Sequence, residues 1–199
     1  MKNDILDLGC GKNKVKNSIG MDKIELEGVD VIHNLLSIPY PFKEQSFKVI
    51  YLRHVIEHFK IEDINIILLE CYRILSLNGK LIITVPHAFS VAAYTDITHK
   101  TFFTFNSGKF FDYEHPMSYY YKKYNMNYKL VEIDCKVCWF DWKSRILQRL
   151  DAFLSKIARY ILLNAIKNTK KPSLADRIVK KKSYQFVEIK WFYKKKLVV

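Results

Sequence analysis

The stretch DILDLGCG, residues 4–11, decides the fold of this chain. A short apolar run over residues 4–8 predicts a strand, and it ends directly in two glycines that are one residue apart, Gly9 and Gly11. Because glycine has no side chain, a ligand can lie directly on the backbone of such a loop, and Asp7 places an acid beside it. Open α/β sheets bind ligands at the carboxyl ends of their strands, so this stretch predicts a ligand site as well as a strand.

Two nucleotide-binding patterns compete for this glycine loop. The dinucleotide fingerprint needs a third glycine where the chain has Lys14, which disfavours hydride-transfer chemistry. The phosphate-binding P-loop needs Gly-Lys followed by Ser or Thr, and Gly11, Lys12 and Asn13 do not supply it. The remaining interpretation is a loop for S-adenosylmethionine, whose methionine part would meet the glycines and whose amino group Asp7 would help to hold.

The rest of the chain alternates strand and helix signals. Turn residues separate short apolar segments, and one longer segment has apolar residues at helical spacing that Gly79 is expected to end. Such alternation predicts an α/β fold with a mainly parallel sheet and right-handed crossovers. Only fifteen positions separate Asp7 from Asp22, so the first crossover is abbreviated, and the second is similarly short. The expected strands are residues 4–8, 18–22, 29–34, 47–52 and 80–86, and the expected helix is residues 61–75.

The C-terminal part has a different pattern. Two long strands with alternating side chains, residues 128–140 and 183–193, are expected to pair antiparallel at one sheet edge, and residues 145–167 between them have the periodicity of an amphipathic helix. With 199 residues, 49% of them hydrophobic, the chain can bury the core of one domain. That domain, residues 1–199, is expected to have a cofactor-binding half over 1–88, a lid or acceptor segment over 89–124, and the C-terminal strands, helix and basic tail over 125–199.

The charge of the chain is strongly basic and unevenly spread. The sequence has 33 Lys and Arg against 20 Asp and Glu, a formal +13, and residues 167–196 hold eleven of the basic residues against two acids. This surplus suggests an anionic partner. Three explanations are open for this basic segment. The favoured one is a surface of lysines that contacts only solvent. Peripheral contact of residues 145–182 with an anionic membrane comes second, and binding of nucleic acid is less favoured. The sequence indicates no oligomeric state.

Cysteine usage bears on location. The chain has four cysteines and no signal peptide at its N-terminus, which predicts reduced thiols and a cytoplasmic protein, with the inner face of the membrane as the place of any peripheral contact. No apolar run approaches the roughly 18 residues that a membrane-spanning helix needs.

Several features in a fixed order extend the pattern of the glycine loop. They are LDLGCG at 6–11, Asp22 at the end of the second strand, Asn34 and Leu35 after the third, SFKVIYLRHVIEHF at 46–59 and YRILSLNGKLIITVPH at 72–87. In these features, over residues 1 to about 112, the chain resembles the class I S-adenosylmethionine-dependent methyltransferase family, in particular its small members of the Methyltransf_11 type. The resemblance implies a Rossmann-like, mainly parallel sheet of seven strands with helices on both faces, and S-adenosylmethionine as the methyl donor.

The resemblance also implies which residues contact the cofactor. Asp22 would accept hydrogen bonds from both ribose hydroxyls. The amide of Asn34, where many family members carry an acid, would meet the adenine edge, with Leu35 as an apolar neighbour. The full set of candidate cofactor residues is Asp7, Gly9, Cys10, Gly11, Asp22, Asn34, Leu35, Arg53 and His54.

Residues 54–58, HVIEH, match the H-x-x-E-H pattern of one class of zinc peptidase. That chemistry needs a helix that presents His54 and His58 one turn apart, with Glu57 as the general base and a third ligand from elsewhere. The strand just before His54 favours a loop that lines the cofactor pocket instead, so we expect no metal. Glu57 and His58 are expected to secure the turn into the next helix.

A second polar group follows the fifth strand, in VPHAFSVAAYTDITHKTFFT, residues 85–104. It resembles the DPTHxxFFT segment of the same family, which faces the acceptor, although Ile97 replaces the proline. His99 and His87 are candidate general bases because imidazole titrates near neutral pH, and Asp96 is the third catalytic candidate. The alternative for each histidine is a structural place in an aromatic cluster. The candidate substrate contacts are Tyr94, Phe103 and His58.

These features predict an enzyme that transfers a methyl group from S-adenosylmethionine, by in-line displacement, to a small-molecule, glycan-precursor or lipid-linked acceptor. No NPPY-type motif is present, which argues against methylation of exocyclic base amines. Three alternatives stay open: an RNA-directed methyltransferase that uses the basic C-terminus, a partner subunit that binds the cofactor without its own catalysis, and an H-x-x-E-H zinc peptidase.

Overall fold

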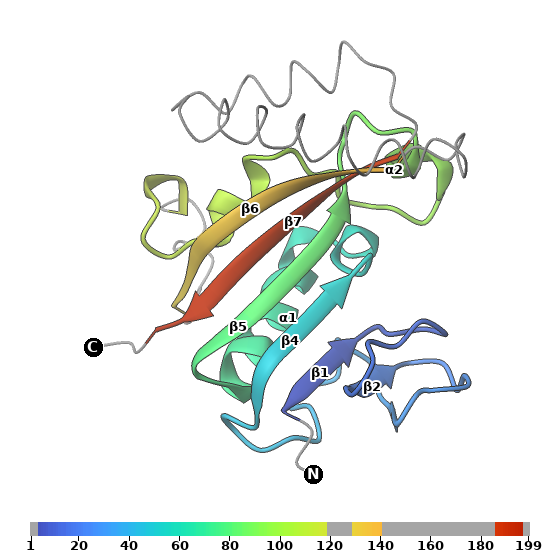
Figure 1. The fold of residues 1–199 in the computed structure, drawn as a ribbon, viewed down its shortest axis with the longest axis vertical. Helices are drawn as coiled ribbons and strands as arrows, with labels where there is room; N and C mark the ends of the chain where they lie inside the picture. The colour runs from blue at the N-terminus through green and yellow to red at the C-terminus, as the bar shows by residue number, and fades with distance from the viewer. Residues whose placement is uncertain (1–3, 119–128, 141–185, 197–199) are drawn as a thin grey trace, which may run out of the picture.

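A seven-stranded mixed sheet forms the centre of the molecule (Figure 1). The computed structural model describes residues 4–118, 129–140 and 186–196, so the amphipathic helix and most of the basic tail expected from the sequence lie outside the described residues. The strand order is β3-β2-β1-β4-β5-β7-β6, and the first five strands run parallel. The strands are β1 (Ile5–Leu8), β2 (Ile19–Asp22), β3 (Val31–Ile32), β4 (Phe47–Arg53), β5 (Leu75–Pro86), β6 (Leu130–Phe140) and β7 (Phe186–Lys195).

The C-terminal strands complete the sheet as an antiparallel pair. β7 lies between β5 and β6 and runs antiparallel to both, although it follows β6 in the sequence (Figure 1). The expected antiparallel pair and the mainly parallel α/β fold are therefore confirmed.

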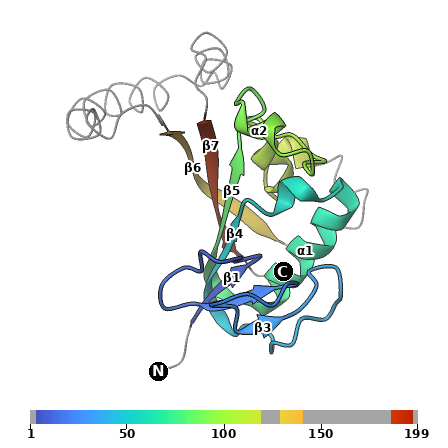
Figure 2. The same ribbon diagram turned by 90° about the vertical axis from the view of Figure 1, so that its right-hand side faces the viewer.

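One long helix, α1 (Ile61–Ile74), packs on the sheet because its apolar side chains recur every three to four residues. Ile64, Ile67, Leu68 and Cys71 on this face are fully buried. Figure 2 shows α1 on the same side of β4 and β5 as the short helix α2 (Ala92–Thr95). The remaining described helical turns are the 3₁₀ helices η1 (Ile56–His58), η2 (Ser107–Phe111) and η3 (Pro116–Ser118).

Loops replace helices in the first crossovers. Residues 9–18, between β1 and β2, and residues 23–30, between β2 and β3, contain no helix, as the short spacing predicts. Helices on both faces, which the family resemblance implies, are therefore not found in these described connections. The reason is length, since ten and eight residues must both cross the sheet edge and return.

The end of α1 differs from the sequence prediction. The expected C-terminal glycine, Gly79, lies inside β5, and the chain is already extended at Leu75. The pairing of β4 with β5 steps from Phe47 opposite Leu75 to Val49 opposite Lys80, so the intervening residues of β5 bulge out of the ladder. The left-handed residue of this bulge is Asn78, with φ of 63°.

A lysine from β7 closes the C-terminal end of α1. Lys195 is buried, and its Nζ donates hydrogen bonds to the carbonyl oxygens of Tyr72 and Leu75 at 2.7 and 2.8 Å. The last carbonyls of a helix have no partner within the helix, and a cation there also complements the helix dipole. Burial lowers the pKa of Lys195.

The described parts of the chain contain no helix long and apolar enough to cross a membrane.

Candidate active site

The carboxyl ends of the parallel strands surround a pocket of about 270 Å³. This volume is just below the range of about 300 to 1,000 Å³ that is usual for ligand sites, and the pocket is open to solvent, so a nucleoside-sized ligand would extend beyond it. We call it the donor pocket. Its walls come from the ends of β1, β2 and β4, from the segment after β3, and from η1. The lining residues are Gly9, Asp22, Lys23, Asn34, Leu35, His54, Val55, His58 and Phe59.

The two glycines of the loop after β1 have different reasons to be glycine. Gly9 has φ of 65°, and a Cβ atom there would stand 2.6 Å from Cγ2 of Val55. Gly11 also has a left-handed backbone, with φ of 51°, but a Cβ atom there would meet nothing within 4 Å. Gly9 is thus required by close packing beside the pocket, and Gly11 by backbone conformation alone.

Asp22 stands at the end of β2 with its carboxylate partly satisfied. Its Oδ2 accepts a hydrogen bond from the backbone N–H of Gly11 at 2.9 Å, and its Oδ1 accepts one from that of Ile24 at 3.1 Å. A carboxylate has about four acceptor positions, so both oxygens can still accept a bond from a ligand hydroxyl. The two backbone bonds fix the carboxylate at the pocket wall.

Asn34 and Leu35 form the wall that follows β3. Oδ1 of Asn34 accepts a hydrogen bond from the N–H of Leu36 at 3.0 Å, which leaves the amide nitrogen as a donor for a ligand. Leu35 is 7% exposed, and its carbonyl accepts the hydroxyl of Tyr40. This wall therefore offers one polar edge and one apolar face.

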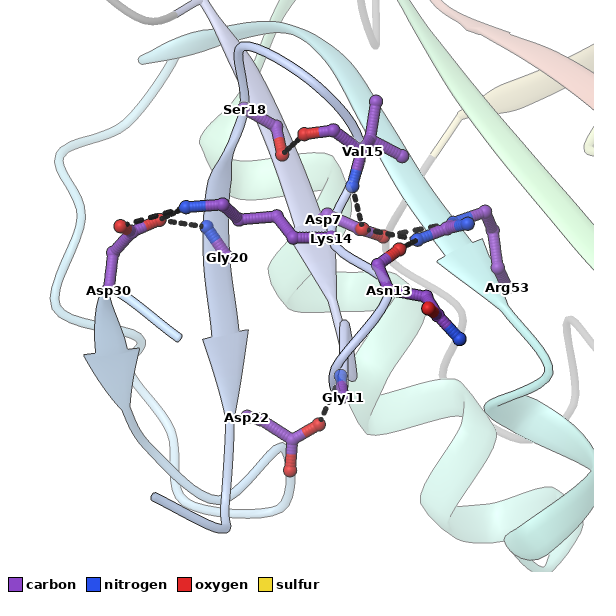
Figure 3. A network of polar contacts seen from close by, with 10 residues as sticks. All are labelled: Asp7, Gly11, Asn13, Lys14, Val15, Ser18, Gly20, Asp22, Asp30 and Arg53. Carbon is purple, nitrogen blue, oxygen red and sulfur yellow. Dashed lines mark hydrogen bonds and ion pairs between the residues drawn. The ribbon is translucent and has the colours of Figure 1, made fainter. Parts of the chain in front are cut away.

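Asp7 does not line the donor pocket, because it is committed to holding the loop that follows it (Figure 3). Asp7 is fully buried and accepts hydrogen bonds from the N–H of Val15 at 2.8 Å and from Nη2 of Arg53 at 2.6 Å. Arg53 also donates to the carbonyl oxygen of Asn13. The structure thus places Asp7 and Arg53 differently from the sequence expectation, as partners of each other rather than of the cofactor.

A second acid fixes the other side of the same loop (Figure 3). Asp30 accepts hydrogen bonds from Nζ of Lys14 at 2.8 and 2.9 Å and from the N–H of Gly20 at 2.6 Å. Cys10 is buried, and a Cβ atom at Gly20 would lie 2.8 Å from its Sγ, so the thiol packs on the backbone of β2 and away from the pocket. Burial raises the pKa of Cys10.

His54 carries a positive charge at the pocket wall. It has φ of 55°, its Nε2 lies 2.9 Å from a carboxylate oxygen of Glu188, and its Nδ1 lies 3.4 Å from one of Glu57. These two carboxylates, Glu188 first, raise the pKa of His54 to about 9. His54 is therefore protonated at neutral pH and does not serve there as a base.

The helix that a zinc peptidase needs is absent at residues 54–58, which the structure describes in full. His54 has a left-handed backbone, and only residues 56–58 form a turn of 3₁₀ helix. His54 and His58 do not stand one α-helical turn apart, so the peptidase hypothesis is not supported. The structure instead brings His58 against His99, with ring centroids 4.8 Å apart.

The predicted catalytic and substrate residues after β5 separate into buried and exposed groups. His87 is fully buried outside the pocket lining, and its Nδ1 accepts a hydrogen bond from the N–H of Phe89. Phe103 is 3% exposed and packs edge-on against Trp191, so it belongs to the core rather than to a substrate surface. Tyr94 is 63% exposed and stacks on a second aromatic ring, that of Phe102.

Asp96 organises the turn that carries His99. Its Oδ1 accepts hydrogen bonds from the hydroxyl and the N–H of Thr98 at 2.7 and 2.8 Å. These bonds lower the pKa of Asp96, and the bond from the hydroxyl is the larger cause. Nδ1 of His99 lies 2.8 Å from the carbonyl oxygen of Ala93. Neither Asp96 nor His99 lines the donor pocket, but His99 reaches its edge through His58.

Sequence reasoning missed three residues of the pocket lining and one partner of the site. Lys23, Val55 and Phe59 line the pocket, and each is a direct chain neighbour of a residue that was predicted to do so. Glu188 had no such signal, because it lies on β7, more than a hundred residues after His54.

Comparisons with known proteins agree with this geometry. A family model described as a methyltransferase domain matches residues 6–83. Three solved structures share the fold with a TM-score of 0.54 each: a SAM dependent methyltransferase from Archaeoglobus fulgidus (18% identity, 96% of this chain and 85% of that chain), a putative methyltransferase from Bacillus halodurans C-125 (16%, 99% and 94%) and a SAM-dependent methyltransferase from Methanosarcina mazei (11%, 100% and 95%).

At these identities the likeness to solved structures concerns the fold alone. A search of curated protein sequences finds no match. The family match nevertheless spans β1 through most of β5, which is the part of the sheet that builds the donor pocket. Residues 6–83 of the chain thus match a methyltransferase domain, and the fold is that of the SAM-dependent methyltransferase structures to which the chain is similar.

Proposed function

We propose that the enzyme binds S-adenosylmethionine in the donor pocket and methylates a small acceptor with an apolar part, either a lipid-linked intermediate or a glycan precursor or other small molecule. One observation carries the placement of the donor. Gly9, Asp22 and Asn34 lie at the carboxyl ends of three neighbouring strands and line one pocket. The methionine chain needs an open backbone surface, which Gly9 offers. The ribose needs a carboxylate that accepts its two hydroxyls, and the adenine needs an amide that donates to its edge; Asp22 and Asn34 supply these.

The pocket residues fit that donor one by one. The bare backbone at Gly9 gives room for the methionine chain, and the two fixed oxygens of Asp22 can each accept a ribose hydroxyl. The amide nitrogen of Asn34 can donate to an adenine nitrogen, and the side chain of Leu35 offers an apolar surface to the ring.

S-adenosylmethionine supplies a methyl group that its sulfonium charge has already activated. The protein then has to hold an acceptor atom in line with that methyl, and positioning of this kind can supply about 7 to 11 kcal/mol of the barrier. Two of the histidines proposed from the sequence line the pocket: His54 is engaged by Glu188 and Glu57, whereas His58 bonds to the hydroxyl of Thr98. We therefore place the acceptor atom at the end of the pocket that His58 borders.

The exposed surface beside His99 supports an acceptor with an apolar part. Large apolar side chains of the segment after β5 are unusually exposed, and Tyr94 and Phe102 stack with ring centroids 4.9 Å apart. An exposed apolar group of this kind commonly marks a binding surface. Its members are Phe89 (49% exposed), Val91 (55%), Tyr94 (63%), Ile97 (94%) and Phe102 (45%).

Calorimetry with the full chain tests the donor site. We expect micromolar binding of S-adenosylmethionine, weakened at least about 100-fold by Asp22→Ala, because two charge-assisted hydrogen bonds of about 1.5 to 3 kcal/mol each are lost. Glu27→Ala, which removes an exposed carboxylate five residues further on, is the matched control and should leave the affinity unchanged. No binding by the folded wild-type chain would overturn the proposal.

Transfer of a labelled methyl group tests the acceptor. The enzyme and labelled S-adenosylmethionine are incubated with a cell extract that has been separated into lipid, water-soluble and RNA fractions. We expect label in the lipid fraction or on a water-soluble small molecule. Label confined to RNA would favour the RNA-directed alternative, and binding of the donor without label in any fraction would favour a partner subunit without its own catalysis.

A further inference from the structure

We propose that Glu57, His58 and His99 form a binding site for a divalent transition-metal ion of the zinc class, at the border of the donor pocket. We call these three residues the histidine cluster. One ligand atom from each of them lies within 4.8 Å of the other two. Two come from η1 and the third from the turn after α2, so the fold brings together residues that are more than forty positions apart.

The backbone holds these two segments together. The carbonyl oxygen of Glu57 accepts hydrogen bonds from the N–H groups of Lys100 and Thr101 at 2.7 and 3.1 Å. The residue next to Lys100 is His99, so the same contacts fix the histidine beside η1. A site built on such ties is organised before any ligand arrives.

The hydrogen-bond pattern fixes the proton positions on both rings. The hydroxyl proton of Thr98 goes to Asp96, at 2.7 Å, so this oxygen can only accept from Nδ1 of His58, at 2.8 Å. Nδ1 of His99 lies 2.8 Å from the carbonyl oxygen of Ala93, which also can only accept. In the neutral rings both protons are therefore on Nδ1, and each Nε2 keeps the lone pair that a metal ligand needs.

Glu57 supplies the second, independent sign of a missing ligand. Its side chain is 1% exposed, and neither carboxylate oxygen makes a hydrogen bond. The nearest charge is Nδ1 of His54 at 3.4 Å, and that ring has its shorter contact, 2.9 Å, with Glu188. Buried carboxylates are normally hydrogen-bonded or bound to a metal, and this one has no hydrogen bond and only the 3.4 Å ion pair with His54, so its oxygens still have acceptor positions for a cation.

The donor set indicates the kind of metal. Two imidazole nitrogens and one carboxylate oxygen are the set of many zinc sites that keep a fourth position open, whereas Mg²⁺ and Ca²⁺ prefer oxygen ligands. Tetrahedral zinc with bonds of about 2.1 Å places its ligand atoms about 3.4 Å apart. The separations of up to 4.8 Å must therefore shorten by no more than about 1.4 Å, which side-chain rotation can supply.

This site differs from the H-x-x-E-H arrangement of the peptidases. There both histidines of the motif bind the metal and the glutamate acts as the base, whereas here His54 is engaged by Glu188 and Glu57 becomes a ligand. Because His58 also lines the donor pocket, the open position would be available to an acceptor oxygen, whose proton a metal makes easier to lose. This role, unlike metal binding itself, rests on the proposed function.

Metal binding by the full chain tests the inference. The protein is stripped with a chelator, its fold is checked by circular dichroism, and it is titrated with Zn²⁺ by calorimetry and with Co²⁺ by visible absorption. We expect one equivalent of Zn²⁺ and the intense visible bands of tetrahedral Co²⁺. Glu57→Gln and His99→Ala should each weaken binding at least about 100-fold, because each removes a metal ligand. His33→Ala removes a histidine outside the cluster and should change nothing.

S-adenosylmethionine binding, measured on the same samples, separates this inference from the proposed function. A folded chain that binds the donor but takes up no zinc would overturn the metal site and leave the donor site intact. Zinc uptake that Glu57→Gln and His99→Ala leave unchanged, or that His33→Ala reduces as much, would also overturn it. Stoichiometric zinc without donor binding would overturn the proposed function alone.

Discussion

The two ends of the donor pocket differ in how their polar groups are satisfied. At the glycine-loop end, Asp7 and Asp22 each accept hydrogen bonds from the protein itself. At the histidine end, the carboxylate of Glu57 makes no hydrogen bond, and His58 and His99 each direct Nδ1 to a protein oxygen, while Nε2 of His99 lies 4.0 Å from a carboxylate oxygen of Asp96. The carboxylates of the first end are therefore held in place by the protein before any ligand binds, whereas Glu57 at the second end has no hydrogen bond to hold it.

Breaking the glycine-loop end at its tightest point should have the largest effect. Gly9→Val forces a side chain into Val55 at a left-handed backbone, so we expect a loss of about 3 kcal/mol in stability and no measurable donor binding. Thermal unfolding and calorimetry measure both. Gly28→Ala is the control: φ there is 89°, but a Cβ atom meets nothing within 4 Å, so the cost should be near 1 kcal/mol with binding kept.

Removing the partner of Asp7 comes second. Arg53→Met leaves the buried carboxylate with the N–H of Val15 alone, and we expect a loss of about 2 to 3 kcal/mol in the free energy of unfolding. Lys48→Met breaks a pair with Asp4 in which the lysine is 74% exposed, so it should leave the free energy of unfolding unchanged within error. Denaturant titration distinguishes them. Weaker donor binding at unchanged stability would show that Arg53 contacts the cofactor after all, as its sequence position suggested.

A change far from both ends provides a reference for purely structural loss. Lys195→Met removes two hydrogen bonds to the end of α1, and we expect a loss of about 1 to 2 kcal/mol with donor and zinc binding unchanged. Lys194→Met, one position earlier on the same strand, is the matched control. If Lys195→Met altered zinc or donor affinity, the separation between scaffold and site would be wrong.

The smallest expected effect sharpens what is special about Glu57. Glu132 on β6 also has a buried oxygen without a hydrogen bond, and burial, followed by the charge of Asp112, raises its pKa to about 7. Because its pKa is higher folded than unfolded, its contribution to stability is present below about pH 4.5 and is lost as the pH rises to about 7.

Glu132→Gln should therefore leave stability unchanged at pH 4 and raise it above pH 7 by about 1 kcal/mol, once solvent screening is allowed for. Thermal unfolding at several pH values measures this. Among the described residues, the group that could hold a metal is Glu57, His58 and His99 and does not include Glu132, so zinc affinity should not change. A pH-independent difference between the two proteins would contradict the shifted pKa.

The sequence predicted what depends on neighbours in the chain. Apolar periodicity located α1 and all the strands, and the positions of Gly9, Asp22 and Asn34 at strand ends placed them in one pocket. It failed where a longer-range contact decides. Gly79 was predicted to end the helix, whereas in the structure it lies in β5, next to the bulge in the pairing with β4.

Side-chain partners were the hardest part to predict. Asp7 and Arg53 both stand at ends of adjacent parallel strands, so each was expected to face the ligand, but the same adjacency lets them pair with each other. The sequence predicted that Phe103 contacts the substrate, but in the structure it packs edge-on against Trp191 of β7 and belongs to the core. No local pattern encodes such contacts, because they join residues 46 and 88 positions apart.

The position of β7 between β5 and β6 also sets an order for folding. On a ribosome, β5 is synthesised about a hundred residues before β7, the strand that pairs with its outer edge. Lys195, which bonds to the last carbonyls of α1, is synthesised equally late. Until residues 186–195 are synthesised, the outer edge of β5 and the last carbonyls of α1 lack these partners, and an unpaired strand edge favours association with other chains.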